Sequence, residues 1–421
     1  MPSAIVAGAT GILGREIVFE LSRSPQQWPT VHALSRSKKE EYPNNVIHHH
    51  IDLQSSASEM ASSLQNVRCE YVFFAAYLQK DSEQENWDVN GALMSNFLEA
   101  LVTTGAMRDV KRILLVTGAK QYGVHLGAVK NPMLESDPWL TGPEWPPNFY
   151  YNQQNILREF CSTHNKEWTV TYPNDVIGYA YGNFMNLALA IAIYASVTRE
   201  LGQELVFPGA PEFYTKFDSF TSSKLHAEFC AWAALEPRAA NEAFNVVNGD
   251  TESWQNLWPK VASRFDVKVK PDQFASAAGA WTKVIKDRLP ASLTSHGDKN
   301  QPTSTPLYKK PPVSAIAPSV GLEGHPITTQ SNLVKQIDLV QWAQREDVKS
   351  AWQTIAKRDS VREDALEKAT WDFLQFVLSR DYDLVISMSK ARKAGWTGYV
   401  DSWESLDGAF TELEKNGVVP T

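Results

Sequence analysis

Short apolar runs alternate with segments of helical periodicity along the first half of the chain. The first run, residues 4–7, stops at a glycine, and apolar residues at helical spacing begin at residue 12. An apolar run of strand length followed by a helical period indicates a strand, a tight turn and a helix. Further strands are expected over 28–34, 45–51, 69–76, 112–118 and, with the loop at its end, 168–178; a helix is expected over 86–101. This alternation predicts an α/β fold with a parallel, doubly wound sheet, which binds ligands at the carboxyl ends of its strands.

The second half of the chain is mainly helical. A long apolar helix is expected over 184–197, and helices over 219–235 and 254–265 flank a strand over 244–247. From about 277 to 330 the periodicity stops, and prolines mix with Ser, Thr and Gly. This stretch is longer than an ordinary connection, so we interpret it as an insertion that forms a lid, a partner surface or a passive surface loop. Helical patterns then return up to Gly395, and a last amphipathic helix closes the sequence.

The turn after the first strand has a glycine spacing that suits a pyrophosphate. Two residues separate Gly8 from Gly11 and Gly11 from Gly14, and Thr10 lies among them. Glycines let a ligand approach the backbone closely, while the N–H groups and dipole of the following helix favour negative charge. We therefore expect a dinucleotide here, with a purely structural turn as the alternative. The residues expected to hold it are Gly8, Thr10, Gly11, Ile12 and Leu13.

The end of the second expected strand indicates which dinucleotide binds. An acidic residue about twenty positions past the glycines would hold a ribose 2′-hydroxyl, whereas an arginine accepts a 2′-phosphate. Arg36 stands there, between Ser35 and Ser37. The cofactor is therefore expected to be NADP or NADPH, with a solvated basic segment as the alternative interpretation.

Two further strand ends are expected to border the cofactor. Asp52 and Leu53 follow the third strand, where the adenine edge is often met in this type of fold; a simple turn aspartate is the alternative. Ala75 and Ala76 end the fourth strand, and their small side chains would let the backbone pass close to a cofactor. We expect all four residues to contact the dinucleotide.

The composition argues against several other classes of function. A formal net charge of -8 over 421 residues gives no electrostatic reason to bind nucleic acid or an anionic membrane. Cys69, Cys161 and Cys230 are too widely spaced to indicate a disulfide framework or a zinc site. Residues 48–50 are three histidines, but neighbours on a strand point to opposite faces, so no metal is expected. The longest apolar stretch, 184–197, is too short to span a bilayer, and no leader pattern precedes the first strand, so a cytoplasmic protein is expected.

Residues suited to catalysis follow the fifth strand and open a later helix. Lys120 comes just after residues 112–118, and Tyr150 and Tyr151 lie in the first turn of a helix expected to open near residue 148. A tyrosine in that position beside a nicotinamide can donate a proton or stabilise an oxyanion, as in short-chain dehydrogenases. Those enzymes usually carry a lysine four residues after the tyrosine, but Asn155 stands there.

This combination resembles the progesterone 5β-reductase/iridoid synthase-like (PRISE) family, an atypical branch of the extended short-chain dehydrogenase/reductases. The likeness covers nearly the whole chain, and its motifs are specific when taken together and in order. They are the glycine turn 8–14, Thr117-Gly118-Ala119-Lys120-Gln121-Tyr122, Asn148-Phe149-Tyr150-Tyr151, Phe207-Pro208-Gly209 and residues 241–250. In that family the lysine of the second motif and the tyrosine of the third are catalytic. The resemblance therefore implies Lys120 and, by helix register, Tyr151 rather than Tyr150.

The resemblance also implies further contacts. Cofactor contacts would come from Thr117, Gly118, Tyr151, Pro173 and Val176. Substrate contacts are expected from Tyr77, Tyr122, Phe149, Asn183, Phe184 and Met185. Phe184 and Met185 begin the long apolar helix that would roof the pocket, and a core position is the alternative for both. Three departures affect the expected pocket wall: Gln154-Asn155 replaces an acidic pair, Gly123-Val124-His125-Leu126-Gly127 replaces a Gly-Pro-Phe-Glu segment, and Tyr172 replaces an arginine. They bear on the substrate more than on the cofactor.

The expected organisation has four parts. Residues 1–180 form a Rossmann core that binds NADP, and 181–275 form a mixed segment that adds a sheet strand and pocket helices. Residues 276–330 are the insertion, and 331–421 form a smaller, mainly helical substrate lobe.

The expected function is NADPH-dependent 1,4-reduction of an α,β-unsaturated carbonyl compound, an enone or an enal. Tyr151 would donate a hydrogen bond to the enolate oxygen, and Lys120 would support it through its charge. The alternatives are a tyrosine packed on its helix and a solvent-facing lysine after the strand. One alternative uses the same site for 1,2-reduction of a carbonyl or for a redox-neutral isomerisation or cyclisation. Another is a non-catalytic regulator that senses NADP. The expected partner is a small hydrophobic carbonyl substrate, and the chain is a possible homodimer.

Overall fold

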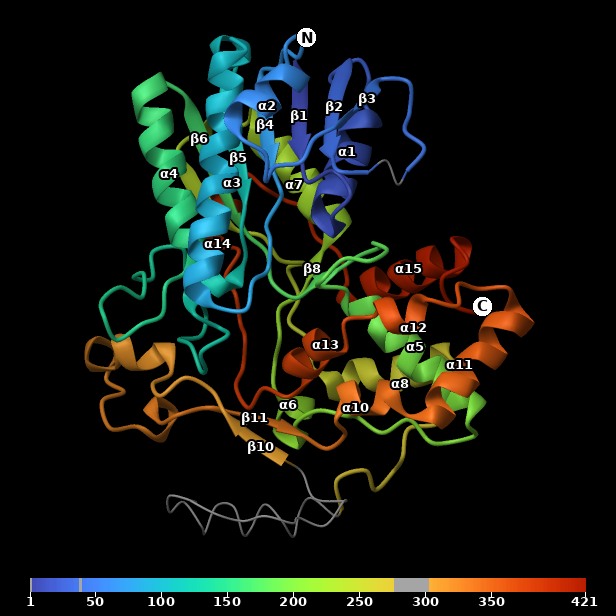
Figure 1. The fold of residues 1–421 in the computed structure, drawn as a ribbon. Helices are drawn as coiled ribbons and strands as arrows, with labels where there is room; N and C mark the ends of the chain where they lie inside the picture. The colour runs from blue at the N-terminus through green and yellow to red at the C-terminus, as the bar shows by residue number, and fades with distance from the viewer. Residues whose placement is uncertain (1, 38–39, 276–302) are drawn as a thin grey trace.

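The computed structural model describes residues 2–37, 40–275 and 303–421 (Figure 1). Its centre is a seven-stranded sheet in the order β3-β2-β1-β4-β5-β6-β9, in which every neighbouring pair is parallel. The strands are β1 (Ser3–Ala7), β2 (Thr30–Ser35), β3 (Val46–His50), β4 (Tyr71–Phe74), β5 (Arg112–Val116), β6 (Glu167–Tyr172) and β9 (Glu242–Asn245). Strand β1 pairs with β2 on one side and β4 on the other, so the strand order reverses beside the glycine turn. A ligand site is expected at such a point.

Helices cover both faces of the sheet. On one face α1 (Ile12–Ser22) packs against α7 (Ser223–Leu235), and on the other α3 (Glu83–Thr103) packs between α2 (Ala57–Ser63) and α4 (Phe149–His164) (Figure 1). Side chains fix where these helices begin: Ser56 and Ser82 form capping boxes with Glu59 and Glu85. The predicted doubly wound α/β fold is confirmed.

A second hydrophobic core lies in the helical lobe, in the lower part of Figure 1. Its central helix, α5 (Leu187–Glu200), is apolar on all sides and almost wholly buried. Around it pack α11 (Glu346–Asp359), α12 (Ala365–Lys368), α13 (Trp371–Leu378) and α15 (Ser402–Lys415). The helical C-terminal region predicted from the sequence is therefore present, and the segment 181–275 contributes both β9 to the sheet and α5 to this lobe. The four domain boundaries themselves stay a prediction.

Part of the expected insertion packs against the rest of the molecule. Residues 276–302 lie outside the described residues, but β10 (Thr303–Pro306) pairs antiparallel with β11 (Asn332–Lys335). The backbone N–H of Val313 then donates to the carbonyl of Ala128 at 3.0 Å, and the Val313 side chain is buried. The described part of the insertion therefore covers the loop that follows β5.

The remaining short elements connect these layers. They are α6 (Pro211–Thr215), β7 (Val176–Ile177), β8 (Thr221–Ser222), α8 (Trp254–Arg264), α10 (Leu339–Gln344), α14 (Ser389–Lys393) and the 3-10 turns η1 (Ala106–Arg108), η2 (Ala119–Tyr122), η3 (Pro237–Ala239), η4 (Pro312–Ala315), η5 (Ala317–Val320) and η6 (Pro326–Thr328). Within the described ranges, no helix is both long enough and apolar enough to cross a membrane.

Candidate active site

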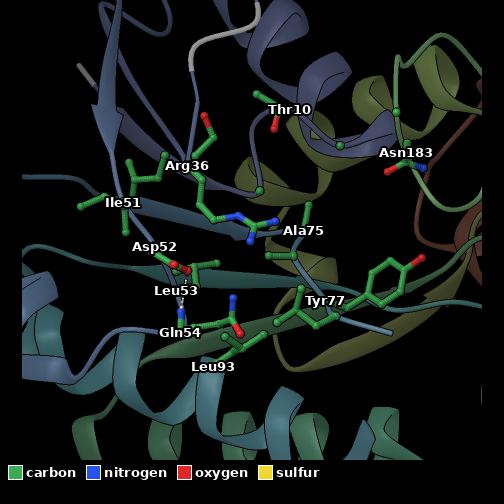
Figure 2. Close-up of a pocket in the computed structure, with 17 residues that line it drawn as sticks. Thr10, Arg36, Ile51, Asp52, Leu53, Gln54, Ala75, Tyr77, Leu93 and Asn183 are labelled. Atoms are coloured by element: carbon green, nitrogen blue, oxygen red, sulfur yellow. Dashed lines mark hydrogen bonds between the residues drawn. The ribbon is translucent and has the colours of Figure 1, made fainter. Parts of the chain in front are cut away.

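Two adjoining cavities open at the carboxyl ends of the strands, and the first lies over the glycine turn (Figure 2). It measures about 220 Å³ and includes Gly8, Thr10 and Gly11 in its wall. A Cβ atom at Gly8, where φ is +85°, would lie 2.6 Å from the carbonyl oxygen of Ala75. A Cβ at Gly14 would lie 2.2 Å from the carbonyl oxygen of Gly8. Only glycine fits these two positions. Gly11 is the N-cap of α1 and provides no side-chain cap, and because Gly11 lines the cavity, the N-terminus of α1 lies at the cavity wall.

Arg36 enters the same cavity from the end of β2. Figure 2 shows its side chain extending between the glycine turn and the strand end that carries Asp52 and Leu53. Asp52 accepts a hydrogen bond from the backbone N–H of Gln54 at 3.0 Å, which fixes that turn. The other lining residues are Leu34, Ser35, Ile51, Gln54, Ala75, Ala76, Tyr77, Leu78, Leu93, Gly182 and Asn183.

The serines on either side of Arg36 are placed differently. The hydroxyl of Ser35 donates to the carbonyl of Ser37 at 2.8 Å and lies 2.9 Å from Nε2 of His48. Ser37 is exposed and lies outside the lining of the cavity, so its expected contact with the cofactor stays a prediction. Its contribution is the carbonyl that orients Ser35.

The second cavity measures about 360 Å³ and continues from the first. Gly11, Ala75, Tyr77 and Asn183 line both. Residues that the sequence assigned to cofactor or substrate supply much of its remaining wall: Ile12, Leu13, Thr117, Gly118, Lys120, Phe149, Pro173, Val176, Phe184 and Met185. The lobe adds Phe373 and Phe376 on α13, which no local sequence signal connected to the site because they lie about two hundred residues further along the chain.

Lys120 lies in η2, directly after β5. Its Nζ donates to both carboxylate oxygens of Glu83, at 2.7 and 2.9 Å, and lies 5.4 Å from the centre of the Phe149 ring. The Lys120 carbonyl accepts a hydrogen bond from the Asn148 amide at 2.8 Å. The lysine and the start of α4 are thus tied together, and Glu83 at the start of α3 holds the ammonium group.

Tyr150 and Tyr151 face different surroundings, although both lie in the first turn of α4. Tyr150 lines the second cavity, and its hydroxyl lies 3.2 Å from where a Cβ at Gly118 would be. Tyr151 donates to the carbonyl of Gln121 at 2.7 Å, accepts from the N–H of Leu140 at 3.1 Å, and stacks on a tryptophan ring outside the cavity. Successive helical residues point about 100° apart, and here this rotation places Tyr150 in the cavity wall and directs the Tyr151 hydroxyl to the protein backbone. The register argument that favoured Tyr151 is corrected in favour of Tyr150.

The environment of Tyr150 keeps its phenol protonated. Burial raises its pKa above the usual value, and the negative charge of Glu83 adds to the effect. Burial also raises the pKa of Tyr77, whose ring stacks on Phe149 with 6.1 Å between centres. Both phenols are therefore protonated at neutral pH, and the Tyr77 hydroxyl is buried without a partner among the described residues.

Tyr122 does not line the cavity, contrary to the expectation from the resemblance. Its hydroxyl donates to Oδ1 of Asn245 at 2.6 Å, and its ring packs edge-on against Tyr172 with 5.8 Å between centres. The end of η2 turns this side chain into the core beside β9. Tyr122 therefore packs in the core beside the sheet, outside the wall of the second cavity.

A buried charged cluster closes the side of the second cavity nearest the lobe. Arg380, which follows α13, donates to both carboxylate oxygens of Asp175, and its Nη1 lies 3.5 Å from Oδ2 of Asp218. Burial opposes ionisation of Asp175, but the Arg380 guanidinium outweighs it and lowers the pKa of that carboxyl. Burial and the charge of Asp175 raise the pKa of Asp218 well above its usual value. The cluster joins the loop after β6 to the helical lobe, a link that sequence spacing could not indicate.

Comparison with known proteins identifies this architecture. Residues 4–286 match the PRISE-like Rossmann-fold domain. The chain belongs to the PRISE family. It is 39% identical to the uncharacterized protein C757.02c of Schizosaccharomyces pombe, over 99% of this chain and 98% of the other. It is 27% identical to the short chain dehydrogenase gsfE of Penicillium aethiopicum, over 99% of both chains. It is 29% identical to a 3-oxo-Δ4,5-steroid 5-β-reductase of Arabidopsis thaliana, over 63% of this chain and 69% of the other.

A solved structure supports the fold independently. The enzyme WbmG of Bordetella bronchiseptica, solved in complex with NAD and UDP, superposes with a TM-score of 0.55 over 100% of this chain and 96% of that one. Sequence identity is 13%, so this likeness concerns the fold alone. Together with the family, the relatives make the PRISE chain an enzyme of the short-chain dehydrogenase/reductase class.

Proposed function

We propose that this PRISE enzyme reduces the carbon–carbon double bond of an α,β-unsaturated ketone or aldehyde with NADPH. The observation that carries the proposal is the position of Tyr150: its phenol lies in the wall of a mainly apolar cavity that continues directly from the glycine-turn cavity. Lys120 lies in the same wall. The name of the Arabidopsis thaliana relative describes reduction of such a double bond, conjugated to a 3-oxo group.

The residues of the first cavity suit a dinucleotide with a 2′-phosphate. Gly8 and Gly11 line this cavity at the N-terminus of α1, where backbone N–H groups and the helix dipole would favour a pyrophosphate. Arg36 would hold the 2′-phosphate, and Asp52 and Leu53 would border the adenine. Thr117, Gly118, Pro173 and Val176 would border the nicotinamide in the second cavity. When bound, the cofactor supplies a hydride to the β-carbon of the substrate.

Tyr150 and Lys120 then act on the carbonyl end of the substrate. Negative charge develops on the carbonyl oxygen as the β-carbon is reduced, and the Tyr150 hydroxyl donates a hydrogen bond to that oxygen. A proton from solvent water then adds to the α-carbon and completes the saturated product. Because burial keeps the phenol protonated, the donor is present throughout the neutral pH range. The ammonium of Lys120, held by Glu83, places a positive charge in the same wall and stabilises the developing enolate.

Consumption of NADPH with a panel of enones and enals, followed by identification of the products, tests the proposal. Saturated ketones or aldehydes are expected, with one NADPH oxidised for each product formed. Allylic alcohols would instead indicate 1,2-reduction, and a converted substrate without NADPH oxidation would indicate a redox-neutral isomerase or cyclase. Tight NADPH binding with no conversion of any panel member would support a cofactor sensor. Each of these three results contradicts the proposal.

A further inference from the structure

Arg36, the residue that would hold the 2′-phosphate, depends on the backbone that carries it. Its side chain is exposed and extends into the first cavity (Figure 2). Strand β2 ends at Ser35, so Arg36 is the first residue of the loop that leaves the sheet. A guanidinium group on a loop contributes to specificity only where the loop holds it in one direction.

The backbone around Arg36 is held on both sides. Before it, the Ser35 carbonyl accepts a hydrogen bond from the N–H of Ile51 at 3.0 Å. The hydroxyl of Ser35 then donates to the carbonyl of Ser37 at 2.8 Å, and this bond spans Arg36. The direction in which Arg36 leaves the loop therefore depends on the position of one serine hydroxyl.

A histidine on the neighbouring strand holds the same hydroxyl. Nε2 of His48, on β3, lies 2.9 Å from the Ser35 oxygen. A serine hydroxyl has a single hydrogen, and Ser35 donates it to the Ser37 carbonyl. His48 must therefore be the donor, through an N–H at Nε2. The Ser35 oxygen is thus fixed by one bond to the loop and one bond to β3.

The sheet and a stacked ring direct His48 toward the loop. In the parallel register of β2 and β3, His48 and Ser35 lie on the same face of the sheet. The ring of Tyr42 stacks on the imidazole, with 6.2 Å between centres and 18° between planes. His49 points to the opposite face, where its Nε2 lies 2.9 Å from Nδ1 of His32. Of these two neighbours on β3, His48 acts on the loop and His49 does not.

We propose that His48 is a positioning residue for NADPH, which holds Ser35 so that the guanidinium of Arg36 stays in place for the 2′-phosphate. This inference rests on the proposed use of NADPH and adds a residue that sets the preference for the phosphorylated cofactor. His48 lies outside the lining of the first cavity, so its effect on the dinucleotide passes through Ser35. NADH has a hydroxyl in place of the 2′-phosphate, so its binding depends less on Arg36.

The test compares the binding of NADPH and NADH to the full chain by fluorescence titration. His48→Leu removes the donor to Ser35 at similar volume. It should weaken NADPH binding by about three- to ten-fold, as expected for one lost hydrogen bond, and leave NADH binding nearly unchanged. His48→Gln, whose amide N–H can reach the position of Nε2, should restore most of the preference for NADPH.

A control and a coupled pair of variants separate positioning from a general effect. His49→Leu removes a histidine contact from the same strand on the other face of the sheet, so it should leave the ratio of the two dissociation constants unchanged. Ser35→Ala should lower the preference for NADPH at least as far as His48→Leu. His48→Leu added to Ser35→Ala should cause no further loss, because one residue acts through the other.

The inference is overturned if His48→Leu weakens NADPH and NADH equally, which would show a purely structural role, or if it changes neither. Additive losses in the double variant, or no recovery with His48→Gln, would also overturn it. In each of these cases the proposed function stands, provided that the wild type prefers NADPH. If the wild type binds NADPH no more tightly than NADH, the proposed cofactor fails and the inference fails with it.

Discussion

Tyr150 and Tyr151 differ in what their hydroxyl groups contact. The Tyr151 hydroxyl is fully used within the protein, by Gln121 and Leu140, whereas that of Tyr150 lies at the cavity beside Gly118. A hydroxyl that is already saturated contributes to stability, and one that faces a cavity is available to a substrate. The two residues should therefore respond differently to the same substitution.

Removal of the hydroxyl group from Tyr150 and from Tyr151, one at a time, distinguishes a role in catalysis from a role in stability. Tyr150→Phe should lower kcat by about 10²–10³-fold, because it removes the donor to the developing oxyanion, while leaving NADPH affinity nearly unchanged. Tyr151→Phe should keep most of kcat but lower the free energy of unfolding by about 1–3 kcal/mol, because two backbone groups lose their partner. Steady-state kinetics and denaturant unfolding of both variants measure this. The account is contradicted if Tyr151→Phe is the inactive variant.

Arg36 decides the preference for the phosphorylated cofactor in our account. Arg36→Ala should weaken NADPH binding by about 10–100-fold, since a charge-assisted hydrogen bond contributes about 1.5–3 kcal/mol, and should leave NADH binding nearly unchanged. Ser37→Ala is the matched control, because Ser37 is a neighbour that lies outside the cavity lining. Fluorescence titration with both cofactors provides the dissociation constants. Equal weakening of NADH and NADPH by Arg36→Ala would argue against a 2′-phosphate contact.

At the scale of secondary structure, the sequence predicted the sheet well. The seven strands were predicted to within a few residues at each end, and for the buried ones this is because buried parallel strands are nearly continuous hydrophobic segments. The edge strand β3, which carries three histidines, is only partly buried. The glycine turn was also predictable, since the close packing at Gly8 and Gly14 excludes other residues. The strands and the glycine turn depend on neighbouring residues in the sequence, so the periodicity of apolar residues and the spacing of glycines predict them.

The rest of the candidate site depends on contacts that a local pattern does not contain. Which tyrosine of α4 faces the cavity depends on the rotation of that helix against η2. Phe376 and Arg380 enter the site from the lobe, about two hundred residues after Pro173 and Asp175. The sequence predicted Tyr122 as a pocket residue because it belongs to the same motif as Lys120. In the structure its side chain turns into the core.

The cluster around Arg380 provides a test of the link between the loop after β6 and the helical lobe. Arg380→Met would leave Asp175 and Asp218 buried without their cation, and should lower the free energy of unfolding by about 3–5 kcal/mol. Addition of Asp175→Asn should restore part of the loss. Arg358→Met is the control: its partners Glu200 and Asp359 lie at the surface, so a change below about 1 kcal/mol is expected.

Denaturant unfolding of the three variants measures these differences. A loss for Arg380→Met no larger than that for Arg358→Met would show that the buried cluster does not hold the loop in place. Comparable losses for the single variant and for the double variant with Asp175→Asn would show that packing, and not charge, dominates at this position.

For the whole molecule, the second cavity draws its wall from both cores. The sheet and its loops supply the glycine turn, Lys120 and Tyr150, and the lobe supplies Phe373 and Phe376. The arrangement gives a polar, backbone-lined region that suits a dinucleotide and an apolar region that suits a carbonyl substrate. Our central claim concerns the place where these two regions meet. There the β-carbon of the substrate is reduced while Tyr150 stabilises the carbonyl oxygen.

The most direct test of that claim is the position of a label. The enzyme is incubated with an enone and NADPH that carries deuterium at the reactive C4 position, and the product is analysed by NMR and mass spectrometry. We predict a saturated ketone with one deuterium on the former β-carbon and none on the carbonyl carbon. Deuterium on the carbinol carbon of an allylic alcohol, or an unlabelled isomer formed without NADPH oxidation, would contradict it.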